Sequence, residues 1–142
     1  MLYRSEFWST TEWDCYGRDA NEYAHDEDGH LVTDNEKTAN LFRILDMVRK
    51  WNPNWKINKT KLGRNSGYRT PEVNEEAGGE PNSQHLYGCA ADISIGGQDD
   101  TDTALADTII AAAKAYNLQD CLGIGYYGDW IHVDCRGETA RW

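Results

Sequence analysis

The chain has 142 residues, a mass of 16.1 kDa, a formal net charge of −10 and a sequence pI of about 4.7. Lys and Arg number 14 against 24 Asp and Glu, which argues against a nucleic acid or an anionic membrane surface as partner. No apolar run is long enough to span a bilayer, so we expect no membrane insertion. The six Trp and eight Tyr indicate a packed globule despite a mean hydropathy of −0.77.

This length fits one domain covering residues 1–142, which we expect to be a monomer. The first residues, MLYRSEFWSTTEWD, contain no apolar core of a secretory signal, so the sequence predicts synthesis in the cytoplasm without a signal peptide. The four cysteines form no CxxC pair, which argues against a zinc ribbon.

In the first third of the chain, TTEWD predicts a short helical turn, and HDEDGHLVTD predicts an acidic hairpin or loop. The latter resembles half a calcium loop but lacks the distal Glu, and His25 and His30 are expected to be solvated there. Thr33 and Glu36 fit a capping box before a helix that reaches about Lys50. The helix follows from apolar residues at helical spacing, namely Leu41, Ile44, Leu45 and Val48.

The rest of the chain alternates strands with one further helix. We predict strands at 55–62 and 89–95, a turn-rich segment between them, a helix at 103–116 capped by Asp102 and Thr103, and two strands within 123–137 joined at Gly128-Asp129. This order predicts an α+β fold with a small, mainly antiparallel sheet and flanking helices.

His85 and Asp92 are separated by six residues in SQHLYGCAADIS, where Gly88 can place His85 on a turn and Asp92 in the following strand. A carboxylate in the apolar run CAADISI is costly unless it is paired or binds a cation. His132 lies in a similar strand, and two His with one Asp and an open fourth position are typical of catalytic zinc. Buried Asp–His hydrogen bonds without metal explain the same residues, so both interpretations stay open at this point.

The segment HLYGCAAD fits the H-x-x-G-x-A-x-D motif and resembles the zinc D-Ala-D-Ala carboxypeptidase family. Upstream, SGYRTPEVN followed by GG and S-x-H is similar to that family's SGYR segment, and GIGYYGDWIHVDCRGETARW is similar to its last strands. The resemblance covers residues 66–142 in three motifs in the family's order.

The resemblance implies the fold shared with lysostaphin-type enzymes and the hedgehog signalling domain. It implies Zn²⁺ held by His85, Asp92 and His132, with a metal-activated water that attacks a peptide carbonyl. Its substrates would be peptidoglycan stem peptides or cross-links of the bacterial cell wall, cut by a D-Ala-D-Ala carboxypeptidase or a phage endolysin. A non-catalytic zinc-containing binding module, or a phage structural module of the same fold, is the alternative.

The same resemblance implies further roles at the site. Arg69 of SGYRT matches the family's substrate-binding arginine, and Asp129 matches the place of a general base three residues before the last ligand. Asp134 competes for that role or serves as a partner of His132 or Arg136. Candidate walls of the substrate pocket are Tyr68, Ser83, Tyr126 and Tyr127, although Tyr at strand positions is more often core.

The strand pattern also makes a prediction about two cysteines. If Asp92 and His132 lie opposite each other in an antiparallel pair, Cys89 lies opposite Cys135 on the other face of the sheet. We expect thiols there more than a disulfide.

Overall fold

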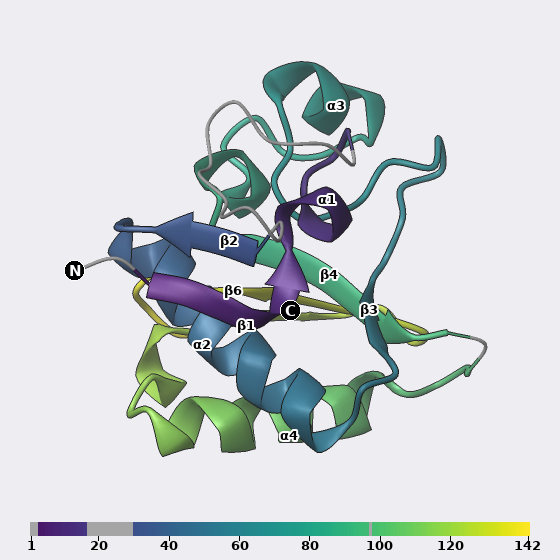
Figure 1. The fold of residues 1–142 in the computed structure, drawn as a ribbon. Coiled ribbons are helices and arrows are strands. Elements are labelled where there is room, and N and C mark those ends of the chain that lie inside the picture. Colours follow the sequence, from purple (N-terminus) through teal and green to yellow (C-terminus); the bar gives the residue numbers. More distant parts are fainter. Residues whose placement is uncertain (1–2, 17–29, 97) are drawn as a thin grey trace.

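The computed structural model describes residues 3–16, 30–96 and 98–142 (Figure 1). The elements are β1 (Tyr3–Ser9), α1 (Thr10–Trp13), β2 (His30–Thr33), α2 (Glu36–Trp51), β3 (Trp55–Ile57), α3 (Pro71–Glu76), the 3₁₀ turn η1 (Gln84–Tyr87), β4 (Ala90–Ile95), α4 (Asp102–Ala115), the 3₁₀ turn η2 (Gln119–Cys121), β5 (Gly123–Tyr126), β6 (Ile131–Asp134) and β7 (Ala140–Arg141). Within these ranges no helix is both long and apolar enough to cross a membrane.

Five strands form the main sheet in the order β3-β4-β6-β5-β7, and β1 pairs with β2 in a separate two-stranded sheet. All neighbours are antiparallel except β5 and β7, which run parallel. The predicted α+β fold with a small, mainly antiparallel sheet and flanking helices is therefore confirmed.

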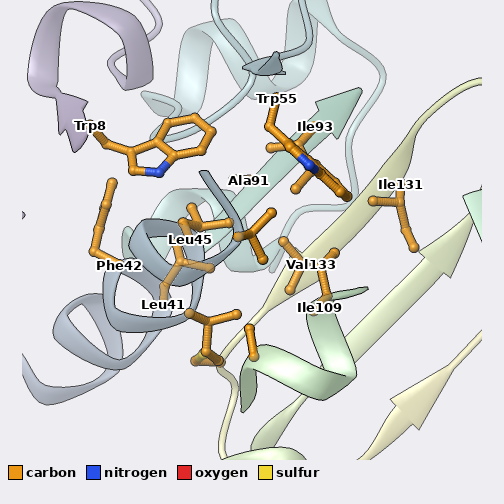
Figure 2. Packing of buried hydrophobic residues seen from close by; sticks show 14 of the residues in the cluster. Trp8, Leu41, Phe42, Leu45, Trp55, Ala91, Ile93, Ile109, Ile131 and Val133 are labelled. Carbon is orange, nitrogen blue, oxygen red and sulfur yellow. The ribbon is translucent and has the colours of Figure 1, made fainter. Parts of the chain in front are cut away.

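The hydrophobic core lies between one face of the main sheet and the helices α2 and α4 (Figure 2). Leu41 and Leu45 come from the predicted apolar stripe of α2, and Ile109 comes from α4. They pack against Val133 and its neighbours on the sheet, all fully or almost fully buried. Removing this much apolar surface from water is the main stabilising term of such a fold.

A buried carboxylate ties β1 to α2. Asp46 of α2 accepts hydrogen bonds from Ser5 Oγ (2.7 Å), from the backbone N–H of Glu6 (3.0 Å) and of Phe7 (3.1 Å), and from the hydroxyl of Tyr3. Because four donors satisfy one carboxylate, its burial carries little desolvation penalty. These bonds fix β1 across the helix.

Both predicted helix starts are wrong in detail. The N-cap of α2 is Asn35, whose side chain accepts from the N–H of Thr38 at 3.1 Å, while Thr33 ends β2 and accepts from the N–H of Asn35. The predicted N-cap, Thr33, is therefore two residues too early, because Asn35 caps the helix instead. In α4 the N-cap position is Thr101, without a side-chain cap bond.

Other differences concern short elements. The strand predicted at 55–62 is limited to β3, and the structure adds β1, α3 and β7, which the sequence patterns did not predict. The helical turn at TTEWD and the strands around Gly128 are confirmed, with Gly128 at φ +85°. The acidic segment before His30 and its calcium-like motif, with His25, lie outside the described residues. His30 is not simply solvated, because its Nδ1 contacts the carbonyl of Ser5 at 2.7 Å.

The register of β4 and β6 places polar and apolar residues on opposite faces. Asp92 pairs with His132, and Ala91 pairs with Val133. Successive side chains of a strand point to opposite faces, so the apolar residues enter the core while Asp92 and His132 meet on the other face. One face of the sheet thus packs in the core, and the other presents the polar side chains of Asp92 and His132.

Candidate metal centre

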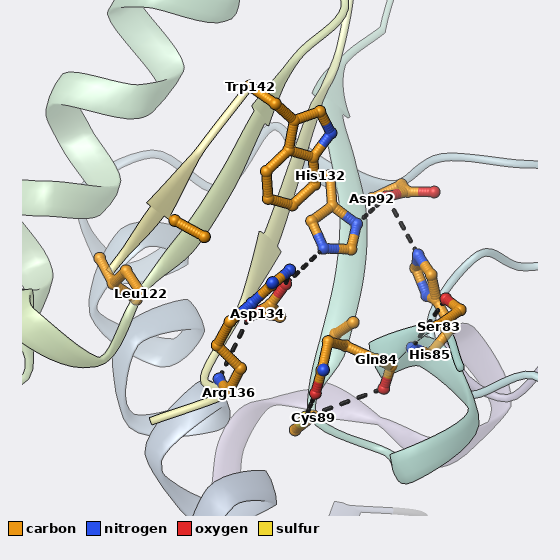
Figure 3. A network of polar contacts seen from close by, with 12 residues as sticks. Ser83, Gln84, His85, Cys89, Asp92, Leu122, His132, Asp134, Arg136 and Trp142 are labelled. Atoms are coloured by element: carbon orange, nitrogen blue, oxygen red, sulfur yellow. Dashed lines mark hydrogen bonds and ion pairs between the residues drawn. The ribbon is translucent and has the colours of Figure 1, made fainter. Parts of the chain in front are cut away.

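Three potential metal ligands converge on the polar face of the sheet (Figure 3). Asp92 comes from β4, His132 from the opposing position of β6, and His85 from η1 just before β4. One ligand atom from each lies within 4.8 Å of the others, and all three residues are buried. The structure therefore brings the three predicted ligands together.

Local backbone geometry aims the ring of His85. Ser83 caps η1 by accepting from the N–H of His85, and Gly88 ends the turn at φ +69°. His85 Nδ1 lies 2.7 Å from the carbonyl oxygen of Gly67, which can only accept, so Nδ1 carries the hydrogen. Its Nε2 then presents a lone pair, 3.3 Å from Asp92 Oδ1.

Asp92 divides its two oxygens between the protein and the centre. Oδ2 accepts from Ser66 Oγ at 2.6 Å and from Arg69 Nη2 at 3.2 Å, and Oδ1 faces both histidines. Burial alone would raise the pKa of Asp92, but the imidazoles of His85 and His132 outweigh it and hold this pKa well below its usual range. The carboxylate is thus anionic and held in position.

His132 is oriented from its far side. Its Nε2 donates to Asp134 Oδ2 at 2.7 Å, and its Nδ1 lies 3.0 Å from Asp92 Oδ1. Burial lowers the pKa of His132, but hydrogen bonds to Asp134 and Asp92 outweigh it and raise this pKa to about 8. Asp134 is fully buried and also accepts two hydrogen bonds from the guanidinium of Arg136 and one from its backbone N–H.

These tautomers decide whether a metal fits. With both distal nitrogens donating to the protein, His85 Nε2, His132 Nδ1 and Asp92 Oδ1 all face one another as acceptors. Such a set is satisfied only by a cation in the middle, a proton or a metal. Two imidazole nitrogens, a carboxylate oxygen and outer partners on each ligand suit zinc with an open coordination position.

Two glycines of β5 make room for this arrangement. Gly125 pairs with His132 and Gly123 pairs with Asp134. A Cβ at Gly123 would lie 2.6 Å from both oxygens of Asp134, and one at Gly125 would lie 2.7 Å from the ring of Trp142. The polar residues of β6 can therefore lean across the neighbouring strand.

The ligands form the floor of a cavity of about 710 Å³. Of the other predicted site residues, Arg69, Ser83 and Tyr127 line it. Its walls are completed by Ala77, Gly78, Gly79, Glu80, Asn82, Gln84, Trp130, Arg136 and Trp142. This volume is in the range of small-molecule and peptide sites.

Four predicted residues do not line the cavity. Tyr68 is buried in the core, with its ring centroid 6.1 Å from that of Trp13, and Tyr126 is exposed outside the cavity. Asp129 is exposed in the turn between β5 and β6, where its Oδ1 accepts from the N–H of Asp100 at 3.3 Å. Asp134 is no free acid, because both of its oxygens accept hydrogen bonds in the interior.

Sequence reasoning missed two parts of the site. Ser66 bridges Arg69 and Asp92, with its Oγ 2.7 Å from Arg69 Nη2. Its place at the start of the SGYR segment was the available signal. Trp142, whose ring centroid lies 5.2 Å from that of His132, comes from beyond β7 and carried no signal in the sequence.

The predicted cysteine register is confirmed. The N–H of Cys135 donates to the carbonyl of Cys89 at 2.9 Å, and both cysteines are buried free thiols. Burial raises the pKa of Cys89 to about 11, so this thiol stays protonated and unreactive at neutral pH.

Replacing Gly67 by alanine is expected to destabilise the fold by roughly 1–3 kcal/mol, the usual cost of overpacking a core. The new Cβ would lie 2.0 Å from Cδ1 of the buried Trp13 and 2.4 Å from that residue's carbonyl oxygen. Chemical denaturation measures the loss. Gly96→Ala is the matched control, because no atom of the described residues outside its chain neighbours lies within 4 Å of its Cβ position, and equal stability of the two variants would contradict the packing argument.

Comparisons with known proteins agree with this geometry. A family model described as Peptidase M15 matches residues 21–134, most of the chain. A zinc D-Ala-D-Ala carboxypeptidase from Streptomyces albus G is 38% identical over 77 residues, which are 54% of this chain but only 28% of that protein. No solved structure matches the chain. The family resemblance drawn from the motifs is thereby confirmed, and the chain belongs to the peptidase M15 family.

Proposed function

We propose that this chain is a zinc peptidase that hydrolyses a peptide bond of peptidoglycan stem peptides, as a D-Ala-D-Ala carboxypeptidase or an endolysin-type endopeptidase. The observation that carries the proposal is the convergence of three lone pairs, from His85, Asp92 and His132, on the floor of an open cavity. The M15 family match and the name of the Streptomyces relative support the reaction class and the substrate. We treat residues 1–142 as a single monomeric domain.

Zinc bound there would supply a Lewis acid that acidifies a water and polarises the scissile carbonyl. The chain's own residues hold the ligands in place. Asp134 orients the His132 ring, the carbonyl of Gly67 orients His85, and Ser66 with Arg69 orients Asp92. Such outer partners commonly change metal affinity or activity by about 10–100-fold when removed.

Arg69 is the proposed anchor for a substrate carboxylate. Its guanidinium lies at the cavity wall, and its buried Nε has no hydrogen-bond partner among the described residues. Because that Nε has almost no accessible surface, an anionic group in the cavity would instead pair with the charge of the guanidinium and with the second hydrogen of Nη1, whose other hydrogen bonds Asn74 Oδ1. Ser83 and Tyr127, which also line the cavity, are retained as substrate contacts, whereas the core position of Tyr68 and the outward position of Tyr126 favour structural roles.

Asp129 remains the proposed general base. The position of Asp134 argues against that acid, because its carboxylate is fully buried and accepts hydrogen bonds from His132 and Arg136. Asp129 is three residues from His132 in the turn beside the cavity residues Tyr127 and Trp130, and its hydrogen bond to Asp100 is long at 3.3 Å. A side-chain rotation would therefore release it toward the site, and catalytic hydrogen bonds often tighten only with substrate bound.

Digestion of purified peptidoglycan by the zinc-loaded protein tests the proposal. Mass analysis of the products should show free D-alanine or cleaved stem peptides, and their identity names the bond that is cut. Products that are unchanged by addition of a chelator would contradict zinc catalysis. Intact peptidoglycan after incubation with the zinc-loaded protein would favour a non-catalytic binding module instead.

A further inference from the structure

The cavity contains a second arginine that the proposed mechanism does not use. Arg136 follows β6 and lines the cavity together with Arg69. Its Nε donates to Asp134 Oδ1 at 2.9 Å and its Nη2 donates to Asp134 Oδ2 at 2.8 Å. Its Cζ also lies 5.1 Å from the ring centroid of Trp142. A two-point ion pair and an aromatic face thus fix the orientation of this guanidinium (Figure 3).

The fixed guanidinium keeps one edge available. Among the described residues Arg136 Nη1 donates to no protein atom, and the side chain is 24% exposed. In Arg69, by contrast, both terminal nitrogens already donate to the protein. Arg136 can lie this close to the sheet because residue 123 is a glycine. A Cβ at that position would lie 2.7 Å from Arg136 Nε. The neighbouring strand thus leaves room for the guanidinium at the cavity.

The charges around the cavity favour an anion. The chain has a formal net charge of −10, yet the walls carry two arginines and, beyond the ligand Asp92, the single acid Glu80 among the lining residues. Arg69 contacts Asp92, and Arg136 reaches His132 through Asp134, so the two guanidinium groups approach the centre behind different ligands. The two guanidinium groups offset the carboxylates of Asp92 and Glu80 among the lining residues, so the charge of a bound Zn²⁺ would make the cavity cationic and concentrate anionic ligands there.

We propose that Arg136 forms a second carboxylate subsite, separate from the one at Arg69, so that the preferred ligand is an amino acid or peptide with two carboxylates close to the scissile bond. This inference rests on the proposed function for its substrate class. A carboxylate on Nη1 of a preoriented guanidinium forms a charge-assisted hydrogen bond, which changes affinity by roughly tenfold or more.

Binding of D-glutamate and D-glutamine to the zinc-loaded protein tests the subsite. The two amino acids share the α-amino acid group and nearly the same shape, and only glutamate has a second carboxylate. Titration followed by NMR should give at least about tenfold tighter binding of D-glutamate. Zinc content is measured before and after, so that loss of metal to the amino acid is recognised. Because no turnover is needed, the result stands whether or not the protein hydrolyses peptidoglycan.

Variants locate the preference. Arg136→Gln should abolish it, and Arg136→Lys should reduce it to less than about threefold, because an ammonium pairs with Asp134 but lacks the forked second edge. D-glutamine should bind all zinc-loaded variants with unchanged affinity. Arg141→Gln removes the same charge outside the cavity and should retain the preference. Equal affinities of the unmodified protein for D-glutamate and D-glutamine would overturn the inference, and so would a preference that survives Arg136→Lys. If Arg136→Gln loses zinc, the test depends on the Arg136→Lys variant alone.

Discussion

Replacing His85 or His132 by alanine is expected to abolish zinc binding, leaving far less than the about one zinc per chain of the unmodified protein. Each variant removes one of three lone pairs that face a common point, and two remaining ligands hold the ion weakly. Metal analysis of the purified variants after dialysis measures the loss. His30→Ala is the matched control, since His30 lies in β2, where its Nδ1 contacts the carbonyl of Ser5, and it is not one of the three residues that converge on the centre.

Stoichiometric zinc in both His85→Ala and His132→Ala would show that the ion lies elsewhere.

Zinc binding is also expected to depend on pH, because the pKa of His132 in the metal-free protein is raised to about 8. Below that pH zinc must displace a proton from the centre, so apparent affinity should fall by up to about tenfold per pH unit. Above it the ring is already neutral and this contribution disappears.

Asp129→Asn is expected to lower turnover by at least about a hundredfold while zinc content and folding stay normal. The carboxylate is exposed in a turn and contacts no metal ligand, so its loss leaves the centre intact. Steady-state kinetics on the peptide identified by product analysis, together with zinc content, check the expectation.

Asp134→Asn gives the opposite pattern and separates the two acids. This change disturbs the hydrogen bond to His132 and the ion pair with Arg136, so we expect weaker zinc binding by about 10–100-fold. Near-normal activity of Asp129→Asn, with Asp134→Asn inactive but fully zinc-loaded, would transfer the role of base to Asp134.

The sequence predicted those parts of the fold in which local pattern and tertiary structure agree. The apolar stripe of α2 and the run CAADISI each have one dominant periodicity, and both are found as predicted. By contrast, β1 depends on hydrogen bonds that its own residues donate to Asp46, which lies about 40 residues further along the sequence. The two residues of β7 depend on pairing with β5. Such non-local contacts leave no local pattern to detect.

The same distinction applies to the site. The opposition of Asp92 and His132 follows from strand register, and the structure has it. The surroundings of Asp129 could not be predicted, because they depend on how the loop at Asp100 meets the β5–β6 turn. Cavity walls such as Trp142 depend on the path of a later strand, which sequence spacing does not encode.

The alternation along β4 and β6 has a consequence for redesign of this scaffold. Ala91 and Val133 face the core, and Asp92 and His132 face the cavity, so a designer can change one set without repacking the other. The polar set, however, is coupled internally: without the two imidazoles, Oδ1 of the buried Asp92 would lose the groups that it faces, and only Oδ2 would keep its bonds to Ser66 and Arg69. A redesign that gives this sheet face a different metal site or reaction therefore has to exchange the ligands and the residues that hydrogen-bond to them together.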